Sequence, residues 1–390
     1  MKKTYLIIGG CTLIVLLLAV WVYLLIYGTP KPVENFFTDF SFSGNSTTEG
    51  AVPFIPEVTD SQVDVGDVSP LRQLTTKAVI GFGEQNSNDT GSVVYAEAGT
   101  GHVYAINLKT GTETRLSNIT IPNAQLAKFS ADGIYVAIRS GYGTQNTIEL
   151  LKLNGENNAT KETLTQKMVD FTFNQKNELL YTEYTNDGLV GRTLTIESKT
   201  TKNLFTVPFQ SATIVWDTTG GTNHYAYPKA SARLTGYLYS IQNGVLSREQ
   251  ASGKGLVALS NANYYVYSIT TGNRPISYVY NRSTGEKNSL PILIQPGKCT
   301  FDKNNIDRMY CGFEKDTPQY EFPDSWYKGL TSFSDKIYDI DIKRGLATQL
   351  SSPEDKVGRP LDIADINNNS TGKMLYFINK NDNTLWMYEI

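Results

Sequence analysis

Four charged residues recur at one position of the sequence, where a predicted strand ends and a turn begins. Glu97, Arg139, Glu183 and Lys229 close the segments SVVYAE, YVAIR, LLYTE and AYPK. Carboxylates and cations gathered around one opening can hold a polar ligand or transfer protons in acid–base catalysis. More commonly, such a ring is only the solvated rim of a fold, and both interpretations stay open here.

A second candidate site is an aromatic stretch between two predicted strands. The segment Glu314–Ser332, EKDTPQYEFPDSWYKGLTS, carries Tyr320, Phe322, Trp326 and Tyr327. Long loops in compact domains are often functional, and aromatic side chains are enriched at binding hot spots. The alternative is that these rings fold back, to plug a central channel or to brace the neighbouring part of the domain.

Two of the three cysteines are placed to form a disulfide. Cys299 and Cys311 fall on the two strands of one predicted hairpin, KCTF and RMYCGF, with the turn DKNNID between them. Opposed residues of an antiparallel pair are close enough for a disulfide, and an exported location would preserve it. The alternative is that both are small buried hydrophobic residues.

The other reactive residues are sparse. The chain has two histidines, His102 and His224, in different repeats, and no G-x-S-x-G elbow. Three cysteines and two histidines argue against a zinc site, and DKNNID lacks the ligand pattern of a calcium loop. The net charge of -3 shows no basic surplus, which argues against nucleic-acid binding. The sequence therefore predicts no enzyme, no metal and no cofactor.

The amino terminus predicts a membrane anchor. Residues 5–27 form an uncharged apolar run long enough to cross about 30 Å of hydrocarbon, with Lys2 and Lys3 before it. This predicts a cytoplasmic tip at 1–4, a transmembrane helix at 5–27 and everything after it outside the cytoplasm. A cleaved signal peptide is the alternative, but the run is longer than a usual h-region and no small-x-small site closes it. Residues 28–69, rich in Pro, Gly, Ser and Thr, predict a flexible linker.

From residue 70 onward, short alternating strands recur as a repeat. VYAINLKTG (103–111) resembles SYVYNRSTG (277–285) and IYDIDIKRG (337–345). The aligned hydrophobic positions, spaced by 39 to 60 residues, are Ile106, Leu153, Ile196, Ile241, Tyr280, Ile340 and Tyr388. This spacing is near the roughly 40–45 residues of a four-stranded propeller blade, and helices between strands are missing. The pattern predicts an all-β, seven-bladed β-propeller over 70–390.

The two ends of this region predict how the ring closes. The last unit has strand candidates at Leu361–Ile366, Met374–Ile378 and Leu385–Ile390 but no fourth strand. The segment PLRQLTT (70–76) resembles the fourth strands and precedes the first unit. Leu71–Thr75 should therefore pair with Leu385–Ile390, which removes an exposed strand edge.

Several motifs resemble known propeller families. The FSADG turn at 129–133 is similar to turns of WD40-like and TolB-like propellers, and segment 298–342 is similar to membrane-anchored propellers of candidate-phylum bacteria. Only Trp216-Asp217 gives a WD pair, outside its expected strand position. The resemblance therefore implies the fold, but neither the WD40 hydrogen-bond network nor any enzyme's active site.

These observations favour a binding function at the cell envelope. We expect a single-pass membrane protein whose propeller presents loops to an envelope protein, a peptide or a glycan. The insertion 314–332 joins the second and third strands of its unit. We therefore expect it on the face that also carries the connections from the last strand of one unit to the first strand of the next. One alternative is a small-molecule hydrolase or lyase that uses the channel mouth, and another is a structural spacer.

Overall fold

The chain divides into two units, Met1–Thr59 and Asp60–Ile390. The computed structural model describes residues 69–85, 91–141, 146–209, 211–271, 274–314 and 321–390. The predicted tip, transmembrane helix and linker lie outside these residues, apart from residue 69. Among the described residues, no helix has both the length and the apolar character needed to span a bilayer.

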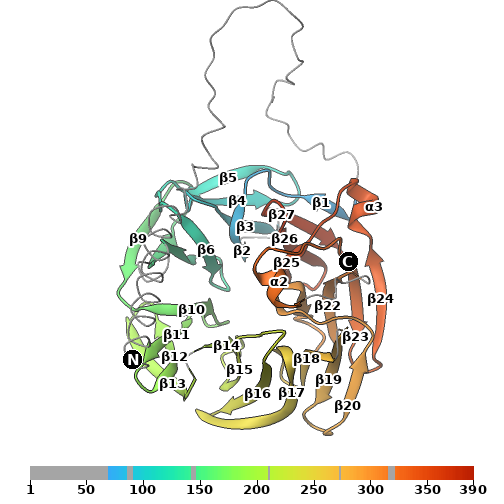
Figure 1. The fold of residues 1–390 in the computed structure, drawn as a ribbon. Helices are drawn as coiled ribbons and strands as arrows, with labels where there is room; N and C mark the ends of the chain where they lie inside the picture. The colour runs from blue at the N-terminus through green and yellow to red at the C-terminus, as the bar shows by residue number, and fades with distance from the viewer. Residues whose placement is uncertain (1–68, 86–90, 142–145, 210, 272–273, 315–320) are drawn as a thin grey trace, which may run out of the picture. The chain divides into compact units, whose positions relative to one another are not determined.

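Antiparallel sheets make up the described part of the second unit, and five of them have four strands each. The first two contain β2 (Val79–Gln85), β3 (Ser92–Glu97), β4 (Val103–Asn107) and β5 (Glu113–Ser117), then β6 (Ala124–Phe129), β7 (Tyr135–Ser140), β8 (Thr147–Leu153) and β9 (Ala159–Leu164). The third contains β10 (Met168–Phe173), β11 (Leu179–Thr185), β12 (Gly188–Thr195) and β13 (Thr200–Val207). We letter the strands of each sheet a to d in this order, which in Figure 1 runs from the centre of the ring outward.

The remaining strands form a seven-stranded sheet and two further four-stranded sheets. The seven-stranded sheet contains β14 (Ala212–Val215), β15 (Asn223–Pro228), β16 (Thr235–Gln242), β17 (Val245–Ser260), β18 (Tyr264–Thr271), β19 (Arg274–Asn281) and β20 (Lys287–Leu290). The next contains β21 (Cys299–Phe301), β22 (Arg308–Phe313), β23 (Lys336–Asp341) and β24 (Leu346–Ser351). The last joins β25 (Ile363–Asn368), β26 (Met374–Asn379) and β27 (Thr384–Glu389) to β1 (Leu71–Gln73).

The seven-stranded sheet differs from the seven separate four-stranded units that the sequence predicts. Its strand β17 pairs with β16 through Val245–Lys254 and with β18 through Lys254–Ser260. We letter β14 to β17 as a to d, and β17 again as a, followed by β18 to β20 as b to d. Gly253 and Gly255 have φ of 158° and 64°, and the register shifts beside them in both pairings. Glycine adopts such φ values at little cost, so β17 bends here instead of ending.

The sheets form a ring in which each shares an apolar core with the next. The cluster around Val94, Ala127 and Ile138 joins the first sheet to the second, and similar clusters follow around the ring. The last of them, with Val79 and Met387, joins the final sheet to the first. The chain is therefore a β-propeller.

The predicted closure of the ring is confirmed. Leu71, Arg72 and Gln73 of β1 lie opposite Tyr388, Met387 and Trp386 of β27 in antiparallel register. The amino-terminal strand thus supplies the outer strand of a sheet whose other three strands come from the carboxyl-terminal end, as Figure 1 shows.

The inner strands approach one another closely at the centre of the ring. At Gly81 of β2, an added Cβ would lie 2.0 Å from the carbonyl oxygen of Ala127 on β6. Only glycine fits at this contact, because any side chain would displace the neighbouring backbone. This packing fixes the inner strands that carry the polar groups described next.

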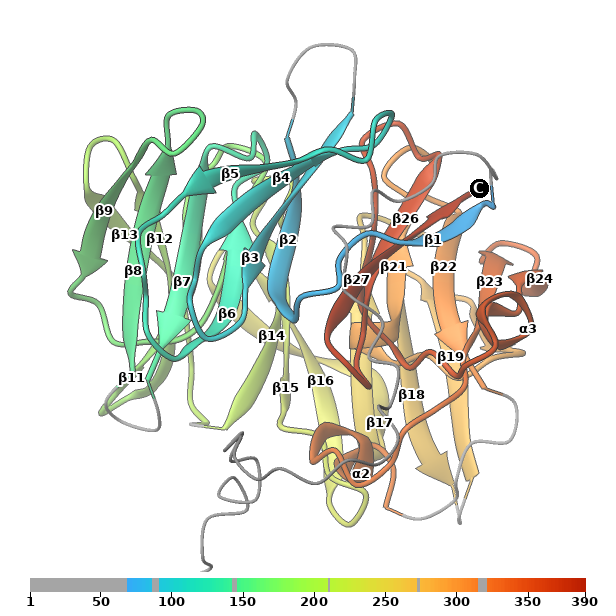
Figure 2. The same ribbon diagram turned by 90° about the horizontal axis from the view of Figure 1, so that it is seen from above.

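Among the described residues, the helical segments are short and lie in the connections between strands. They are η2 (Pro296–Lys298), α2 (Asp324–Tyr327) and α3 (Pro353–Val357). Helix α2 belongs to the insertion between β22 and β23. Figure 2 shows α2 at one edge of the propeller, on the side that carries connections between b and c strands.

Candidate functional site

A cavity of about 840 Å³ opens on the face formed by the connections between a and b strands, which we call the a–b face. Its lining comes mostly from four such connections and the strand ends beside them, β10–β11, β14–β15, β17–β18 and β21–β22. Arg282 of the β19–β20 turn and Asn367 of β25 complete it. In an antiparallel sheet the a–b connections lie at one end of the strands and the b–c connections lie at the other end. The cavity is therefore on the face opposite to α2.

A shared turn chemistry makes this face polar. Asn174, Asp217, Asn261 and Asp302 each follow an a strand and accept a hydrogen bond from the backbone N–H two residues later, over 2.8–3.0 Å. Such Asx turns explain why Asn and Asp recur there, since the side chain replaces a backbone partner. The residue that follows each of these Asn and Asp residues lines the cavity.

The charged groups of the lining are occupied within the protein. Asp217 accepts hydrogen bonds from the backbone N–H and hydroxyl of Thr219, at 3.0 and 2.5 Å. Asp302 accepts from the Tyr310 hydroxyl at 3.2 Å, and Arg282 donates to the Ala262 carbonyl at 3.0 Å. These bonds hold the three charged side chains in place around the turns.

Lys303 is held in the same way at the edge of the cavity. Its Nζ donates to the carbonyl oxygen of Asn368 at 2.5 Å. Burial lowers the pKa of Lys303, because desolvation disfavours the charged ammonium, and nearby Glu84 opposes that effect.

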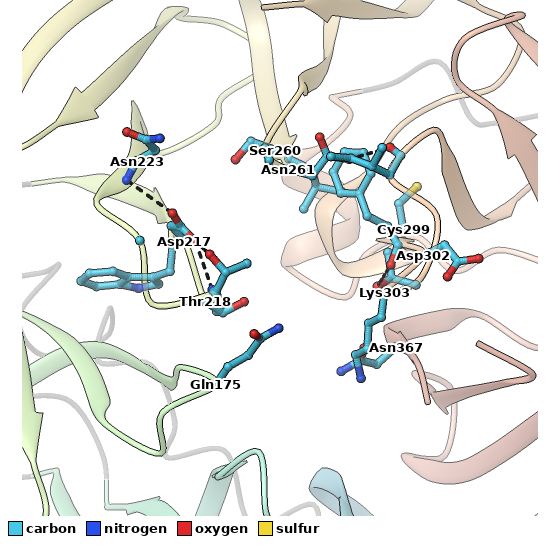
Figure 3. Close-up of a pocket in the computed structure, with 18 of the residues that line it drawn as sticks. Gln175, Asp217, Thr218, Asn223, Ser260, Asn261, Cys299, Asp302, Lys303 and Asn367 are labelled. Atoms are coloured by element: carbon cyan, nitrogen blue, oxygen red, sulfur yellow. Dashed lines mark hydrogen bonds between the residues drawn. The ribbon is translucent and has the colours of Figure 1, made fainter. Parts of the chain in front are cut away.

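The free hydrogen-bonding groups of the lining are instead uncharged. Within the part of the chain that the structure describes, five lining side chains form no hydrogen bond: Gln175, Thr218, Asn223, Ser260 and Asn367. Figure 3 shows Gln175 and Thr218 on one side of the opening and Asp302, Lys303 and Asn367 across it. Amides and hydroxyls from several sheets are thus available to one molecule in the cavity.

One wall of the cavity is aromatic and fixed in place. The Trp216 ring lies 5.5 Å from Phe205 and 5.3 Å from His224, between ring centroids. His224 is itself held because its Nδ1 accepts the backbone N–H of Asp217 at 2.9 Å, and burial lowers its pKa. The Trp216 indole N–H donates to Asp170 of β10 at 3.4 Å.

Asp170 belongs to a small group of charges on the inner strands. Lys128 of β6 pairs with Asp365 of β25 at 3.3 Å, between sheets that lie on either side of the first sheet. Water reaches Asp170, but the surrounding ring of strands desolvates its carboxylate and raises its pKa, against the opposing effects of Lys128 and Trp216. Asp365 raises the pKa of Lys128. The inner strands thus present proton-binding groups next to the Trp216 wall.

The backbone of β25 is irregular where it presents these groups. Asp365 has φ of 50°, a left-handed value that is uncommon for residues other than glycine. The pairing of β25 with β26 shifts register between Ala364 and Asn367. Bulges of this kind re-aim side chains. Here both Asp365 and Asn367 are exposed.

The four charged residues that end b strands are not brought together by any contact within the described residues. Glu97 accepts a hydrogen bond from Thr100 at 2.6 Å, and Glu183 pairs with Arg192 at 2.7 Å. Arg139 donates to the carbonyl of Val169 at 3.4 Å, and Lys229 is exposed. These groups bond mostly to their own surroundings, which favours the interpretation as a solvated rim.

The aromatic insertion is largely folded back onto the propeller. Phe322 and Trp326 are each only 5% exposed and pack in one cluster with Leu293 and Phe333. Their burial leaves little surface for a partner and favours the bracing alternative. Tyr327 is 50% exposed. Tyr320 lies outside the described residues.

The brace continues into a buried ionic group. The Trp326 indole N–H donates to both carboxylate oxygens of Asp362, at 3.0 and 3.1 Å. Lys298 forms ion pairs with Asp362, at 2.5 Å, and with Asp335. On the far side, the backbone N–H of Ala232 donates to Asp324 of α2 at 2.6 Å. The insertion therefore ties the β21–β24 sheet to sheets on both sides.

The predicted pairing of the cysteines is present. Cys299 lies opposite Cys311 in the β21–β22 register, and a disulfide joins them. Among the described residues, no group of three or more His, Cys, Asp or Glu side chains is placed to hold a metal ion.

The sequence did not single out the cavity on the a–b face. A signal was available, because FNQKN (173–177), WDTTGG (216–221) and FDKNN (301–305) lie at the ends of three a strands and are rich in Asn, Asp and Thr. The calcium pattern that DKNNID lacks and the WD pair Trp216-Asp217 did not point to a shared cavity, and the predicted ligand groups lay at the other ends of the strands.

Comparison with known proteins identifies the fold and not a family. No protein-family model and no curated protein matches the chain. An oligogalacturonate lyase from Vibrio parahaemolyticus has a similar structure, with a TM-score of 0.54 and 9% identity, over 82% of this chain and 93% of that one. A xyloglucanase from Xanthomonas campestris gives 0.51 and 10%, over 81% and 53%. A β-propeller domain from Myceliophteria thermophila gives 0.50 and 9%, over 82% and 99%.

These similarities correct the prediction that the chain is not an enzyme. That prediction is wrong, because it took the missing catalytic motifs as decisive, whereas the propellers similar to this chain include a lyase. At 9% identity the likeness concerns the fold alone. The fold hosts both binding modules and lyases.

Proposed function

We propose that this protein is a membrane-anchored, extracytoplasmic binding module whose ligand enters the cavity on the a–b face. The apolar run at 5–27 supports the anchor and the single-pass topology. The Cys299–Cys311 disulfide supports an oxidising compartment for the propeller. The resemblance of segment 298–342 to membrane-anchored propellers of candidate-phylum bacteria points the same way.

In this proposal the propeller has seven blades. The seven-stranded sheet then represents two blades that share β17, the outermost strand of one and the innermost strand of the next. The pairing of β17 with β16 along one half and β18 along the other supports this assignment. Five four-stranded sheets and this double sheet complete the ring.

The observation that carries the binding proposal is the set of free polar groups around a large cavity. About 840 Å³ lies within the range of roughly 300–1,000 Å³ that is usual for ligand sites. Gln175, Asn223 and Asn367 offer amides that bond to nothing else in the described chain. A structural spacer would need neither feature. The ligand is an envelope component, and binding is on the a–b face rather than on the face of the aromatic insertion.

A photocrosslinking experiment tests this proposal in native membranes. Full-length protein carrying benzoylphenylalanine at Thr218, inside the cavity, should give a discrete adduct with an envelope component. The same probe at Asn288, on the outer strand β20, is the matched control. Adding Ser260→Trp, which fills the cavity, should abolish the adduct. Equal adducts from both positions, or an adduct insensitive to Ser260→Trp, would overturn the proposal.

A second candidate function is acid–base catalysis on the bound molecule, as in the hydrolase or lyase alternative. It is favoured by Asp170, whose raised pKa suits proton transfer and whose carboxylate contacts the Trp216 wall. Wild-type protein would then convert its crosslinking ligand to a product of changed mass during incubation. Asp170→Asn would retain the adduct at Thr218 but form no product. An unchanged ligand after long incubation with wild type would exclude this candidate.

A further inference from the structure

We infer that the cavity on the a–b face recognises a neutral, polyhydroxylated ligand, a short uncharged oligosaccharide. This inference rests on the proposed function, because it names the ligand class of the same site. The lining supports this ligand class, because several of its amides and hydroxyls are free and its charged groups are already hydrogen-bonded.

The charged groups of the lining are already hydrogen-bonded within the protein. Asp217, Asp302 and Arg282 each bond to their own turn or to a neighbouring strand, and Lys303 donates to a backbone carbonyl. A charged ligand would have to compete with these bonds, and breaking them would destabilise the Asx turns that shape the face. Each ion of the lining is therefore already hydrogen-bonded within the protein, whereas five amide and hydroxyl side chains of the described lining are not.

The free groups of the described lining are amides and hydroxyls. Gln175, Asn223 and Asn367 each provide an amide donor and an amide acceptor, and Thr218 and Ser260 each provide a hydroxyl. A sugar hydroxyl is also both donor and acceptor, so it can bond to either end of an amide. Groups placed on several turns around one opening can pair with hydroxyls distributed around sugar rings.

Trp216 supplies a fixed aromatic ring beside these groups. Trp216 is fixed by Phe205, His224 and its bond to Asp170, so its position costs little ordering entropy on binding. An indole presents a flat apolar surface beside polar groups, which suits the apolar C–H face of a sugar ring. A peptide would instead be recognised through side-chain pockets or by joining a strand edge. The combination of free amides, hydroxyls and one fixed indole favours the sugar.

Titration calorimetry with the full-length protein tests the ligand class. The probes are fragments of neutral glucans, mannans, galactans and chitin, with uronate-containing fragments and unrelated peptides for comparison. At least one neutral fragment should bind, and its affinity should stay within about twofold between roughly 0.05 and 0.5 M salt, because screening acts only on charges. Binding confined to uronates or peptides, or no binding of any neutral fragment, would overturn the inference.

Single substitutions then assign the contacts. Gln175→Ala and Asn367→Ala should each weaken a neutral fragment about threefold to tenfold, the loss expected for one hydrogen bond. Asn288→Ala, which removes an exposed amide from the outer strand β20, should leave its affinity unchanged. An equal effect of all three substitutions would contradict the assignment, and thermal unfolding checks that each variant is folded.

The two proposals fail in different ways. If a charged fragment binds and Ser260→Trp blocks it, the ligand class is wrong but the site stands. If a neutral fragment binds equally well to Ser260→Trp, both the site and the proposed function are wrong. Thr218→Trp, on a different turn, serves as a second filling variant where Ser260→Trp does not fold.

Discussion

Lys298 is shared by two buried aspartates, Asp335 and Asp362. Desolvation raises the pKa of Asp335 to about 6, against the opposing effect of Lys298, and the charge of Asp362 adds to the rise. A buried carboxylate that is only partly compensated costs free energy when it is ionised. The protonation of Asp335 therefore affects the stability of the fold.

We expect this residue to make the fold more stable as the pH falls. The pKa of Asp335 is about 6 in the folded state against an ordinary 3.8, so the folded state binds the proton first. Its contribution to the free energy of unfolding is fully present below about pH 4 and is lost as the pH rises through 6. Urea denaturation at pH 5, 6 and 7 should show this trend in wild type and not in Asp335→Asn.

Asp382 provides a control of opposite sign. Burial pushes the pKa of this carboxyl up, but hydrogen bonds from Thr384 and Arg359 outweigh burial and hold it below its usual range. Its contribution is present above about pH 4 and lost on further acidification, so Asp382→Asn should not change the trend between pH 5 and 7. If Asp335→Asn kept the full dependence over that range, the assignment to Asp335 would be wrong.

At the scale of elements, the short helix α2 is held by contacts rather than by its own length. A four-residue helix has no independent stability, so its position depends on Trp326 and on Asp324. The Trp326 ring lies 5.1 Å from Lys298 Nζ and 4.8 Å from Lys380 Nζ, measured to the ring centroid. The insertion thereby acts as a structural brace between sheets.

Removing the indole N–H should show this role. Trp326→Phe keeps an aromatic ring but removes the indole hydrogen bonds to buried Asp362, and we expect the free energy of unfolding to fall by about 1–3 kcal/mol. Leu330→Ala, in the same insertion and 75% exposed, should change it by less than about 0.5 kcal/mol. Equal effects of the two substitutions in urea denaturation would show that the insertion is not a brace.

The sequence predicted these elements unevenly. Strand positions followed from alternation and turn residues, and the Cys299–Cys311 pairing followed from the register of one hairpin. The sequence left open whether Phe322 and Trp326 are buried, because they pack with Leu293 and Phe333, and Trp326 also bonds to Asp362, just before β25. The cavity was missed for a similar reason. Asn367 reaches it through the bulge in β25, which alternation alone does not reveal.

At the scale of the whole molecule, the ring is closed by three residue pairs between β1 and β27. Leu71 is 3% exposed and packs in the core between the last two sheets. The closure was the most predictable long-range feature, because a missing strand at one end matched an extra strand at the other. The continuity of β17 across Gly253 and Gly255 was not predictable, since a glycine within a strand pattern weakens the strand and does not show whether the strand continues.

Weakening the closure should destabilise the entire ring. We expect Leu71→Ala to lower the free energy of unfolding by about 2–5 kcal/mol, the usual cost of removing a buried leucine side chain. Leu346→Ala, on β24 and 58% exposed, is the matched control and should have little effect. Hydrogen exchange should also accelerate in β27 of Leu71→Ala. Unchanged stability and exchange would mean that β1 is dispensable.

The continuous strand β17 also constrains how this propeller can change by recombination. Blades joined by turns can be exchanged or duplicated as separate modules, because a cut in a turn leaves both neighbours with complete sheets. A cut within Val245–Ser260 would instead break the central strand of the seven-stranded sheet, which pairs with β16 along one part and with β18 along the other. Residues 212–290 should therefore be inherited, grafted or deleted as one cassette.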